Sequence, residues 1–289
     1  MCRLLGGRWG LYAWRQRQGA PEKQAAENAQ LSAEIQAVLQ AVLQEHRGFY
    51  GSPRIHQELR AARHPASRHR FARRMRRADF RARTCRPFRP CSRASRGASG
   101  VVDNLLHQDF RPSATSRCWA GDFIYIRIAA GRRYLAVWIN LCTRRVFGWK
   151  LDARMDAALV IEALHRALGQ RQVEPEQLLL NRDQGSQSRA SDYRELLCRH
   201  AIVCSMSARG CCRDNTVVES LFSTLKFLEL HLDDNREEPI SPKKLQRELG
   251  LWIEGCNNRK RRHSTMGNLS PIDYEQQFIA APTLTPINP

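Results

Sequence analysis

The pattern of apolar and polar positions predicts an all-helical front half of the chain. Apolar side chains recur at spacings of three and four in residues 22–45, the period of an amphipathic helix. A turn at Gly51 and Pro53 precedes a short helix, and Ser67 can cap a further helix with Phe71, Met75 and Ala78 along one side. Helix, turn and helix in this order indicate a helix-turn-helix unit.

Strand patterns follow in the rear half. Residues 122–128 alternate, and residues 133–140 and 144–151 are rich in β-branched and aromatic side chains, which predicts three antiparallel strands. Helical spacing returns in 157–168, around 192–200 and in 216–230, whereas 178–180 and 201–206 are short apolar runs typical of strands. This order predicts a mixed α/β layer fold.

Composition divides the chain into four parts. Residues 83–100 combine Pro, Ser, Gly and Arg without an apolar period, which is typical of a flexible basic linker. We therefore expect a helical basic region at 1–82, a linker at 83–103, a core at 104–275 and a disordered tail at 276–289.

The same composition argues against a membrane or secreted protein. No apolar run approaches the roughly 18 residues that a bilayer crossing needs, and the amino terminus lacks the continuous apolar segment of a secretory signal. Ten cysteines are scattered without a CxxC pair, which favours reduced thiols. We expect a cytoplasmic protein, and a zinc site is the alternative use of the cysteines.

Positive charge is concentrated at the front. Residues 1–118 carry a net charge of +15 and residues 119–289 carry +4, of a total of +19. Fourteen arginines but one acid, Asp79, lie between Arg60 and Arg96, which favours binding to phosphates. The arginines on the helix after Ser67 are the candidate DNA contacts: Arg68, Arg70, Arg73, Arg74 and Arg77. A structural helix coated with arginine is the alternative; codon bias explains the preference for arginine over lysine but not the scarcity of acids.

Three carboxylates stand where they can serve chemistry. Asp122 shares the apolar face of its strand with Ile124 and Ile126, so it is either idle at a wet strand start or held near a cation. Asp183 follows three leucines, where a buried strand gives way to a loop, although an ordinary turn aspartate fits equally well.

Glu219 is the third carboxylate, on the helix expected at 216–230. It borders that helix's apolar stripe, but Thr216-x-x-Glu219 also fits a capping box. Lys226 lies two turns later on the same side. Two strand-end aspartates and a helical glutamate can converge on two divalent ions for in-line displacement at a phosphodiester, and oxygen-only ligands favour magnesium or manganese.

The spacing of these residues resembles that of DDE-type insertion-sequence transposases, specifically the second-reading-frame product with a core like that of retroviral integrase. Sixty residues separate Asp122 from Asp183, thirty-five separate Asp183 from Glu219, and Lys226 lies seven after the glutamate. Similar blocks follow in the family's order: CWAGDFIYI, YLAVWINLCTRRVFGW, RDQGSQ, SMSARGCCRDNTVVESLFSTLK and NNRKRRHSTMGNLSPIDYE. The segments FYGSPRIHQELR and HRFARRMRRADFRAR resemble the upstream DNA-binding region.

The resemblance implies a ribonuclease-H-like mixed sheet flanked by helices, preceded by a small all-α helix-turn-helix-like region. It further implies that Asp122, Asp183 and Glu219 bind two Mg²⁺ or Mn²⁺ ions and that Lys226 contacts the terminal DNA of the element. The expected activity is metal-dependent DNA cleavage and strand transfer. Expected partners are terminal-repeat and target DNA, further copies of the chain and the product of an upstream reading frame, in a nucleoid-associated bacterial setting without a membrane.

Several positions depart from the family pattern. Ile124 replaces a usual Thr, Asn140 stands where an aspartate is common, and Asn181 and Arg182 replace His-Ser before the second aspartate. Ser188 and Cys256 stand where aromatic residues are frequent. None of these changes removes an expected metal ligand. An eroded, non-catalytic DNA-binding copy and a metal-dependent nuclease are the competing hypotheses.

Overall fold

The computed structural model describes the chain in segments. These are isolated positions from 33 to 50 and residues 51–63, 67–77, 79–80, 82, 118–171, 177–182, 191–206, 216–233 and 240–280. Side chains at 226–233 and 278–280, and a few elsewhere, are left out of the description. The chain divides into two compact units, Met1–Thr84 and Cys85–Pro289. The expected linker at 83–103 lies outside the described residues, so the domain boundaries stay a prediction.

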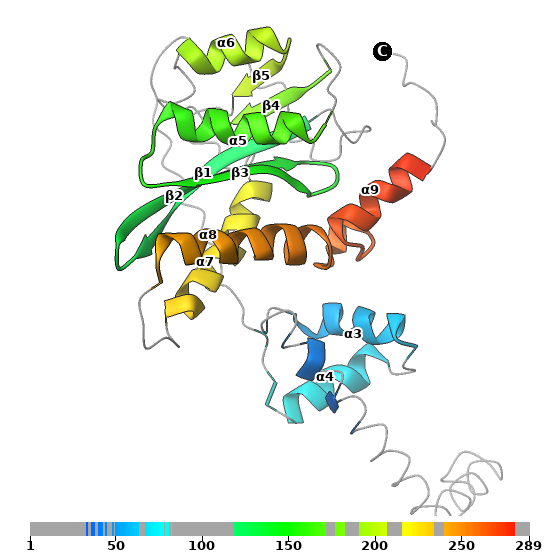
Figure 1. Ribbon diagram of the computed structural model, residues 1–289. Coiled ribbons are helices and arrows are strands. Elements are labelled where there is room, and N and C mark those ends of the chain that lie inside the picture. The colour runs from blue at the N-terminus through cyan, green and yellow to red at the C-terminus, as the bar shows by residue number, and fades with distance from the viewer. Residues whose placement is uncertain are drawn as a thin grey trace, which may run out of the picture. The chain divides into compact units, whose positions relative to one another are not determined.

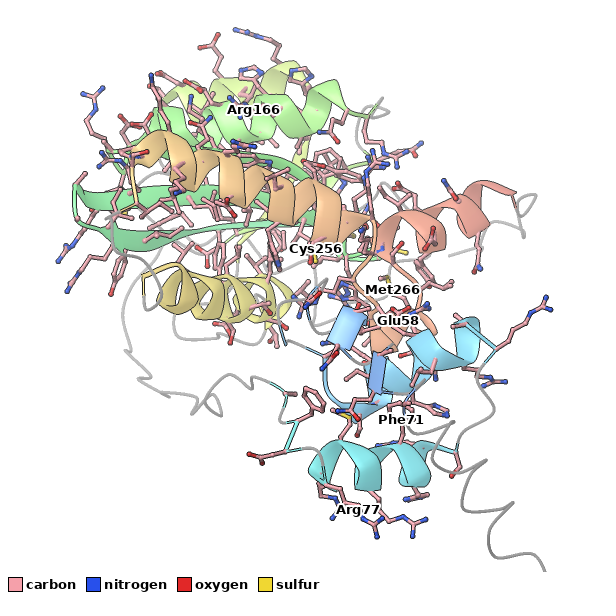
Figure 2. The ribbon with its side chains drawn as sticks, turned by 60° about the horizontal axis from the view of Figure 1, so that its bottom comes forward. Glu58, Phe71, Arg77, Arg166, Cys256 and Met266 are labelled. Carbon is pink, nitrogen blue, oxygen red and sulfur yellow. The ribbon has the colours of Figure 1, made fainter. Side chains whose placement is uncertain are left out.

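The first unit packs two short helices against each other. Helix α3 (Ser52–Ala61) has Pro53 in its first turn, where a missing N–H costs nothing. Helix α4 (Arg68–Arg77) begins directly after Ser67. Figure 2 shows Phe71 between the helices and Arg77 on the outside. The core of this unit contains Val42, Tyr50, Ile55, Leu59, Phe71 and Met75. The described positions between 33 and 44 are helical, in agreement with the amphipathic pattern.

The second unit is built on a five-stranded mixed sheet with the order β3-β2-β1-β4-β5. Strands β1 (Cys118–Ile128), β2 (Gly131–Asn140) and β3 (Val146–Asp152) are antiparallel, as the sequence pattern predicted. Strands β4 (Leu179–Arg182) and β5 (Val203–Met206) continue the sheet in parallel with β1. The β1–β2 turn ends at Gly131, whose φ of +101° suits glycine.

One face of the sheet is covered by helices α5 (Ala157–Gly169) and α6 (Ser191–Arg199) (Figure 1). The core beneath them joins Trp119, Trp138 and Phe147 of the sheet to buried leucines and alanines of the helices. Helix α5 approaches β3 very closely at Gly148, where an added Cβ would lie 2.1 Å from the carbonyl oxygen of Ala163. Glycine therefore sets the spacing between helix and sheet.

The other helices come from the C-terminal third. Helix α7 (Thr216–Asp233) packs on β1, and α8 (Pro242–Gly250) runs directly into the π-helix η3 (Leu251–Asn258), forming one rod in Figure 1. The 3₁₀ turn η4 (Ser264–Met266) and helix α9 (Pro271–Ala280) follow. Helix α9 continues to Ala280, past residue 275 where we expected the core to end. None of the described helices is both long and apolar enough to cross a membrane.

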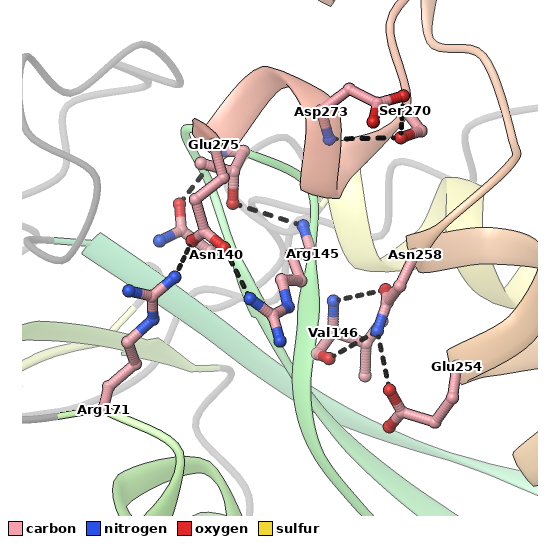
Figure 3. Close-up of polar contacts among 10 residues, drawn as sticks. Asn140, Arg145, Val146, Arg171, Glu254, Asn258, Ser270, Asp273 and Glu275 are labelled. Carbon is pink, nitrogen blue, oxygen red and sulfur yellow. Dashed lines mark hydrogen bonds and ion pairs between the residues drawn. The ribbon is translucent and has the colours of Figure 1, made fainter. Parts of the chain in front are cut away.

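A buried carboxylate attaches α9 to the sheet (Figure 3). Glu275 is 3% exposed and pairs with two arginines from distant parts of the chain. Arg145, just before β3, lies 2.5 Å from one carboxylate oxygen, and Arg171, just after α5, pairs with the other. Both guanidinium groups also lie over the ring of Phe147, at 5.3 and 5.1 Å from its centroid.

Asn140, a departure from the family pattern, closes the β2–β3 turn. Its Oδ1 accepts hydrogen bonds from the backbone N–H groups of Cys142 at 2.8 Å and Thr143 at 3.0 Å. An asparagine oxygen provides the same acceptor as an aspartate here, so the substitution leaves the turn intact.

Candidate active site

The candidate site lies where the neighbouring parallel strands β1 and β4 end their pairing. Their last described pair is Gly121 with Arg182. Asp122 follows Gly121 on β1. Asp183 follows Arg182, the last residue of β4, and lies outside the described residues. Gly121 is required locally because an added Cβ would lie 2.5 Å from ring carbons of Trp138.

Asp122 occupies the strand face that the alternation predicted. It is half-buried, and Ile124, Ile126 and Ile128 of the same face are all buried. Trp119 and Phe123 point to the opposite face, into the core beneath α5. The Oδ1 atom of Asp122 accepts a hydrogen bond from the backbone N–H of Phe123 at 2.8 Å. A wet strand start and a site near a cation are both compatible with this half-burial.

Glu219 lies in the first turn of α7 and is half-buried. Its helix packs on β1, on the side of the sheet away from α5 (Figure 2), and therefore on the side of Asp122. Val218, Leu221, Phe222 and Leu225 of this helix are buried, as the stripe predicted. Thr216 is the first helical residue, which leaves the capping-box interpretation of Glu219 untested.

Lys226 belongs to the same helix, two turns beyond Glu219, and its side chain lies outside the described part of the chain. No group of three His, Cys, Asp or Glu side chains that could hold a metal occurs among the described residues, a set that lacks Asp183. The described structure thus brings Asp122 and Glu219 to one side of the sheet, and the roles of Asp122, Asp183, Glu219 and Lys226 stay predictions.

Arg261, in the basic segment after η3, contacts α7 about one turn after Glu219. The sequence analysis did not predict this contact. Arg261 Nη2 donates to Thr224 Oγ1 at 3.0 Å, and that hydroxyl donates to the carbonyl oxygen of Ser220 at 3.1 Å. The Arg261 guanidinium also lies 5.8 Å from the ring centroid of Trp252. The run of basic residues after η3 was the only feature of the sequence that pointed to this segment. No local pattern predicts that its partner is Thr224 on α7, 37 residues earlier.

Arg182, which departs from the family pattern, is a buried cation at the end of β4. It is 2% exposed, and its guanidinium lies 5.8 Å from the ring centroid of Tyr193 on α6. Burial lowers the pKa of Arg182, while the charges of Tyr193 and Asp122 act to raise it. Burial also raises the pKa of Tyr193. This positive charge lies with Tyr193 on the α5/α6 face of the sheet, opposite the face of Asp122, so it influences the candidate site only through its electric field.

The basic surface of the first unit lies on α4. Arg68, Arg73 and Arg77 are exposed, whereas Phe71 and Met75 are buried. The side chains of Arg70 and Arg74 lie outside the described residues. The alternation of buried apolar and exposed basic residues agrees with the predicted amphipathic basic helix.

Comparisons with known proteins match both units to families. Residues 112–212 match the Integrase core domain and residues 30–88 match an HTH-like domain. The transposase InsF for insertion sequence IS3A of Escherichia coli K12 is 38% identical over 281 residues, which cover 97% of this chain and 94% of that protein.

A second relative is the 31 kDa protein of insertion element IS600 from Shigella sonnei, 33% identical over 96% of this chain and 98% of its own length. Among solved structures, the HTLV-2 integrase catalytic core domain in complex with magnesium is 16% identical, with a TM-score of 0.44 over 57% of this chain and 99% of that one.

Proposed function

The chain belongs to the IS3 family of insertion-sequence transposases, which are polynucleotidyl transferases with an integrase core, and we propose that Asp122, Asp183 and Glu219 form its catalytic centre. The observation that carries this proposal is the register of β1 and β4. Since Gly121 pairs with Arg182, the two aspartates are the next residues on adjacent parallel strands. One residue extends a chain by at most about 3.8 Å, which keeps the two carboxylates near each other.

Glu219 completes the centre from the helix above that strand face. Helix α7 packs on β1, and Glu219 lies in its first turn, half-buried like Asp122. The Arg261–Thr224 hydrogen bond fixes the following turn of the helix, so Glu219 has a defined position relative to the sheet. These contacts support convergence of the three carboxylates.

The donor set fits divalent magnesium or manganese, because it consists of carboxylate oxygens alone. Two such ions, when bound, supply the electrostatic stabilisation of the attacking and leaving oxygens in phosphodiester cleavage and strand transfer. The three carboxylates would hold these ions. Lys226, two turns along α7, contacts a phosphate or base of the element end. The nucleophile is water in cleavage and a 3′ hydroxyl in joining.

The arginines of α4 supply affinity for the element's terminal repeats. Arg68, Arg73 and Arg77 are exposed on the outer side of the helix, and Arg70 and Arg74 belong to the same basic helix. Planar guanidinium groups bind phosphate oxygens bidentately, which suits a DNA backbone. We further propose that the protein works in the bacterial cytoplasm, at the nucleoid, as a multimer bridging two DNA ends together with the upstream reading-frame product.

The test compares isosteric variants on a labelled element end, in magnesium and in manganese. Asp122→Asn, Asp183→Asn and Glu219→Gln should each abolish cleavage and joining but keep DNA affinity, because the ligands act as a unit. Added manganese should raise the melting temperature of the wild-type protein but not that of these three variants. Glu195→Gln, at an exposed residue of α6 that pairs with Arg199, is the matched control and should behave as wild type.

Two outcomes contradict the proposal. Joining at the wild-type rate by any of the three variants would remove that residue from the centre. Specific binding of the wild-type chain to DNA ends, without cleavage in either metal, would identify a non-catalytic DNA-binding copy of the transposase.

A further inference from the structure

The outer end of the β1–β2 hairpin presents an aromatic and basic surface away from the candidate catalytic centre. Beyond Phe123, the side chains of β1 alternate sharply: Ile124, Ile126 and Ile128 are buried, and Tyr125 and Arg127 are exposed. Tyr125 is 51% exposed, an unusual fraction for a large apolar ring in the middle of a strand.

The neighbouring strand places matching side chains beside them. Tyr125 pairs directly with Tyr134, and Arg127 pairs directly with Arg132, so all four side chains lie on one face. The guanidinium of Arg132 lies 5.7 Å from the centroid of the Tyr125 ring. This "hairpin surface" consists of Tyr125, Arg127, Arg132 and Tyr134.

Two arginines lie directly opposite each other on the hairpin surface. Like charges directly opposite each other on adjacent strands repel, and the pair here is exposed at the end of the hairpin. A third arginine, Arg133, follows on the other face, half-buried. Among the described residues of β3, Asp152 pairs with Tyr134, and its Oδ1 accepts backbone N–H groups of Ala153 and Arg154. The hairpin surface thus combines two exposed arginines with one exposed aromatic ring, a composition suited to an anionic ligand.

Exposed aromatic rings combined with arginines are the composition of surfaces that bind nucleic acid. The exposed ring of Tyr125 can stack on a base or sugar, and the guanidinium groups can bind phosphates, whereas Tyr134 is half-buried and packs against the core. The two arginines flank one ring rather than forming a charged patch without apolar character, which favours DNA over an acidic protein segment.

The hairpin surface and Asp122 lie on opposite faces of the sheet. Asp122 is on the α7 face, and Tyr125 and Arg127 point to the face of Phe123, which packs with α5. The separation along β1 is three to five residues, or roughly 10 to 17 Å at about 3.3 Å per residue. A single straight duplex cannot contact both faces, so the ligand of the hairpin surface is a different DNA segment from the one being cut.

We propose that the hairpin surface binds a second DNA segment, through phosphate contacts of Arg127 and Arg132 and stacking on Tyr125. This rests on the proposed function only in taking DNA as the ligand. It adds a second protein surface for DNA within the integrase core unit, separate from α4 of the first unit and from Lys226.

The test measures DNA binding by the full chain in EDTA, so that no cleavage intervenes, by fluorescence anisotropy over a series of salt concentrations. Arg127→Ala/Arg132→Ala should lower the slope of log affinity against log salt by about 1.8, since each lost phosphate contact lowers it by about 0.9. Arg194→Ala/Arg259→Ala removes two exposed arginines from α6 and from the segment after η3, away from the hairpin surface, and should leave the slope unchanged.

Tyr125 gives an independent readout. Tyr125→Ala should weaken binding to a single-stranded probe by about fivefold or more, and Tyr125→Phe should retain wild-type affinity. Without DNA, the melting temperature of Arg127→Ala/Arg132→Ala is the folding control. A value near that of the wild type shows that the variant is folded, and a value many degrees lower would mean that the arginines support the fold instead.

The outcomes separate this inference from the proposed function. Wild-type slope and affinity in the hairpin variants would overturn the inference and leave the catalytic proposal standing, whereas strand transfer by the carboxylate variants would overturn only the latter. Displacement of bound DNA by polyglutamate from the wild-type chain, but not from the hairpin double variant, supports a shared anion site there. Binding of polyglutamate with higher affinity than DNA would assign the surface to an acidic protein and overturn the inference.

Discussion

The side chain of Asn258 hydrogen-bonds both backbone groups of Val146, 112 residues earlier in the chain. Its Oδ1 accepts from the Val146 N–H at 3.0 Å, and its Nδ2 donates to the Val146 carbonyl at 2.9 Å (Figure 3). Val146 begins β3, the edge strand, where the register with β2 shifts. The amide thus satisfies the two backbone groups of an edge-strand residue that is buried and has no further strand of the described sheet beside it.

Replacing Asn258 should therefore destabilise the second unit. Asn258→Ala leaves a buried N–H and a buried carbonyl without partners, with an expected loss of about 1–3 kcal/mol in the free energy of unfolding. Asn258→Asp keeps the acceptor and should cost part of this. Urea unfolding followed by tryptophan fluorescence measures both, and equal stability of Asn258→Ala and wild type would show that water replaces the amide.

Glu275 is expected to be the strongest single polar contact of α9. Glu275→Gln removes the charge that pairs with Arg145 and Arg171, so two partly buried guanidinium groups lose their partner. Because both arginines remain about a quarter exposed, we expect a loss of about 2–3 kcal/mol rather than the full cost of a buried pair. The unfolding free energy of a matched Glu195→Gln variant should fall by only about 0.3–0.5 kcal/mol. Equal losses in the two variants would contradict the buried-pair interpretation.

The strands were predictable because their signals are local. The alternation around Ile124 and Ile126 places a half-buried strand with one apolar face, and the structure confirms it together with the side on which Asp122 lies. The stripe of α7 likewise predicted that Glu219 would border buried residues. These parts of the candidate site follow from periods of two and of about 3.6 residues.

The C-terminal contacts could not be predicted in the same way. Glu275 meets Arg145 across 130 positions, and Arg261 meets Thr224 across 37, so no local period connects them. The π-helix at Leu251–Asn258 adds a further obstacle, because its extra residue per turn displaces the side-chain period. Charged residues in such segments are usually solvated, which is why they carry no signal of burial.

The accessibility of the thiols provides a chemical test of the described fold. Burial raises the pKa of the Cys204 thiol, and the nearby Arg182 charge opposes this; burial likewise raises that of Cys142. A raised pKa lowers the thiolate fraction near neutral pH, so both should alkylate more slowly than Cys198, whose side chain is exposed. The difference should narrow at alkaline pH, where the raised pKa values no longer keep the Cys204 and Cys142 thiols protonated. Peptide-level mass spectrometry after brief iodoacetamide treatment measures it, and comparable rates at neutral pH would contradict the burial of Cys204.

The close packing of α5 on β3 yields the sharpest structural prediction. Gly148→Ala places a methyl group 2.1 Å from the Ala163 carbonyl oxygen and 2.7 Å from the Ala167 nitrogen, both backbone atoms that move only if the helix moves. We expect a loss of about 3 kcal/mol or more in the free energy of unfolding, at the upper end of overpacking costs.

Gly169→Ala is the matched control for this substitution, at the last residue of α5. Nothing lies within 4 Å of a Cβ there, so alanine should leave stability unchanged or raise it by up to about 1 kcal/mol through its better helix propensity. Differential scanning calorimetry of both variants tests the pair. If Gly148→Ala melts within a degree or so of wild type, helix α5 does not approach β3 as closely as described, and the core around Trp138 and Phe147 is looser than its burial indicates.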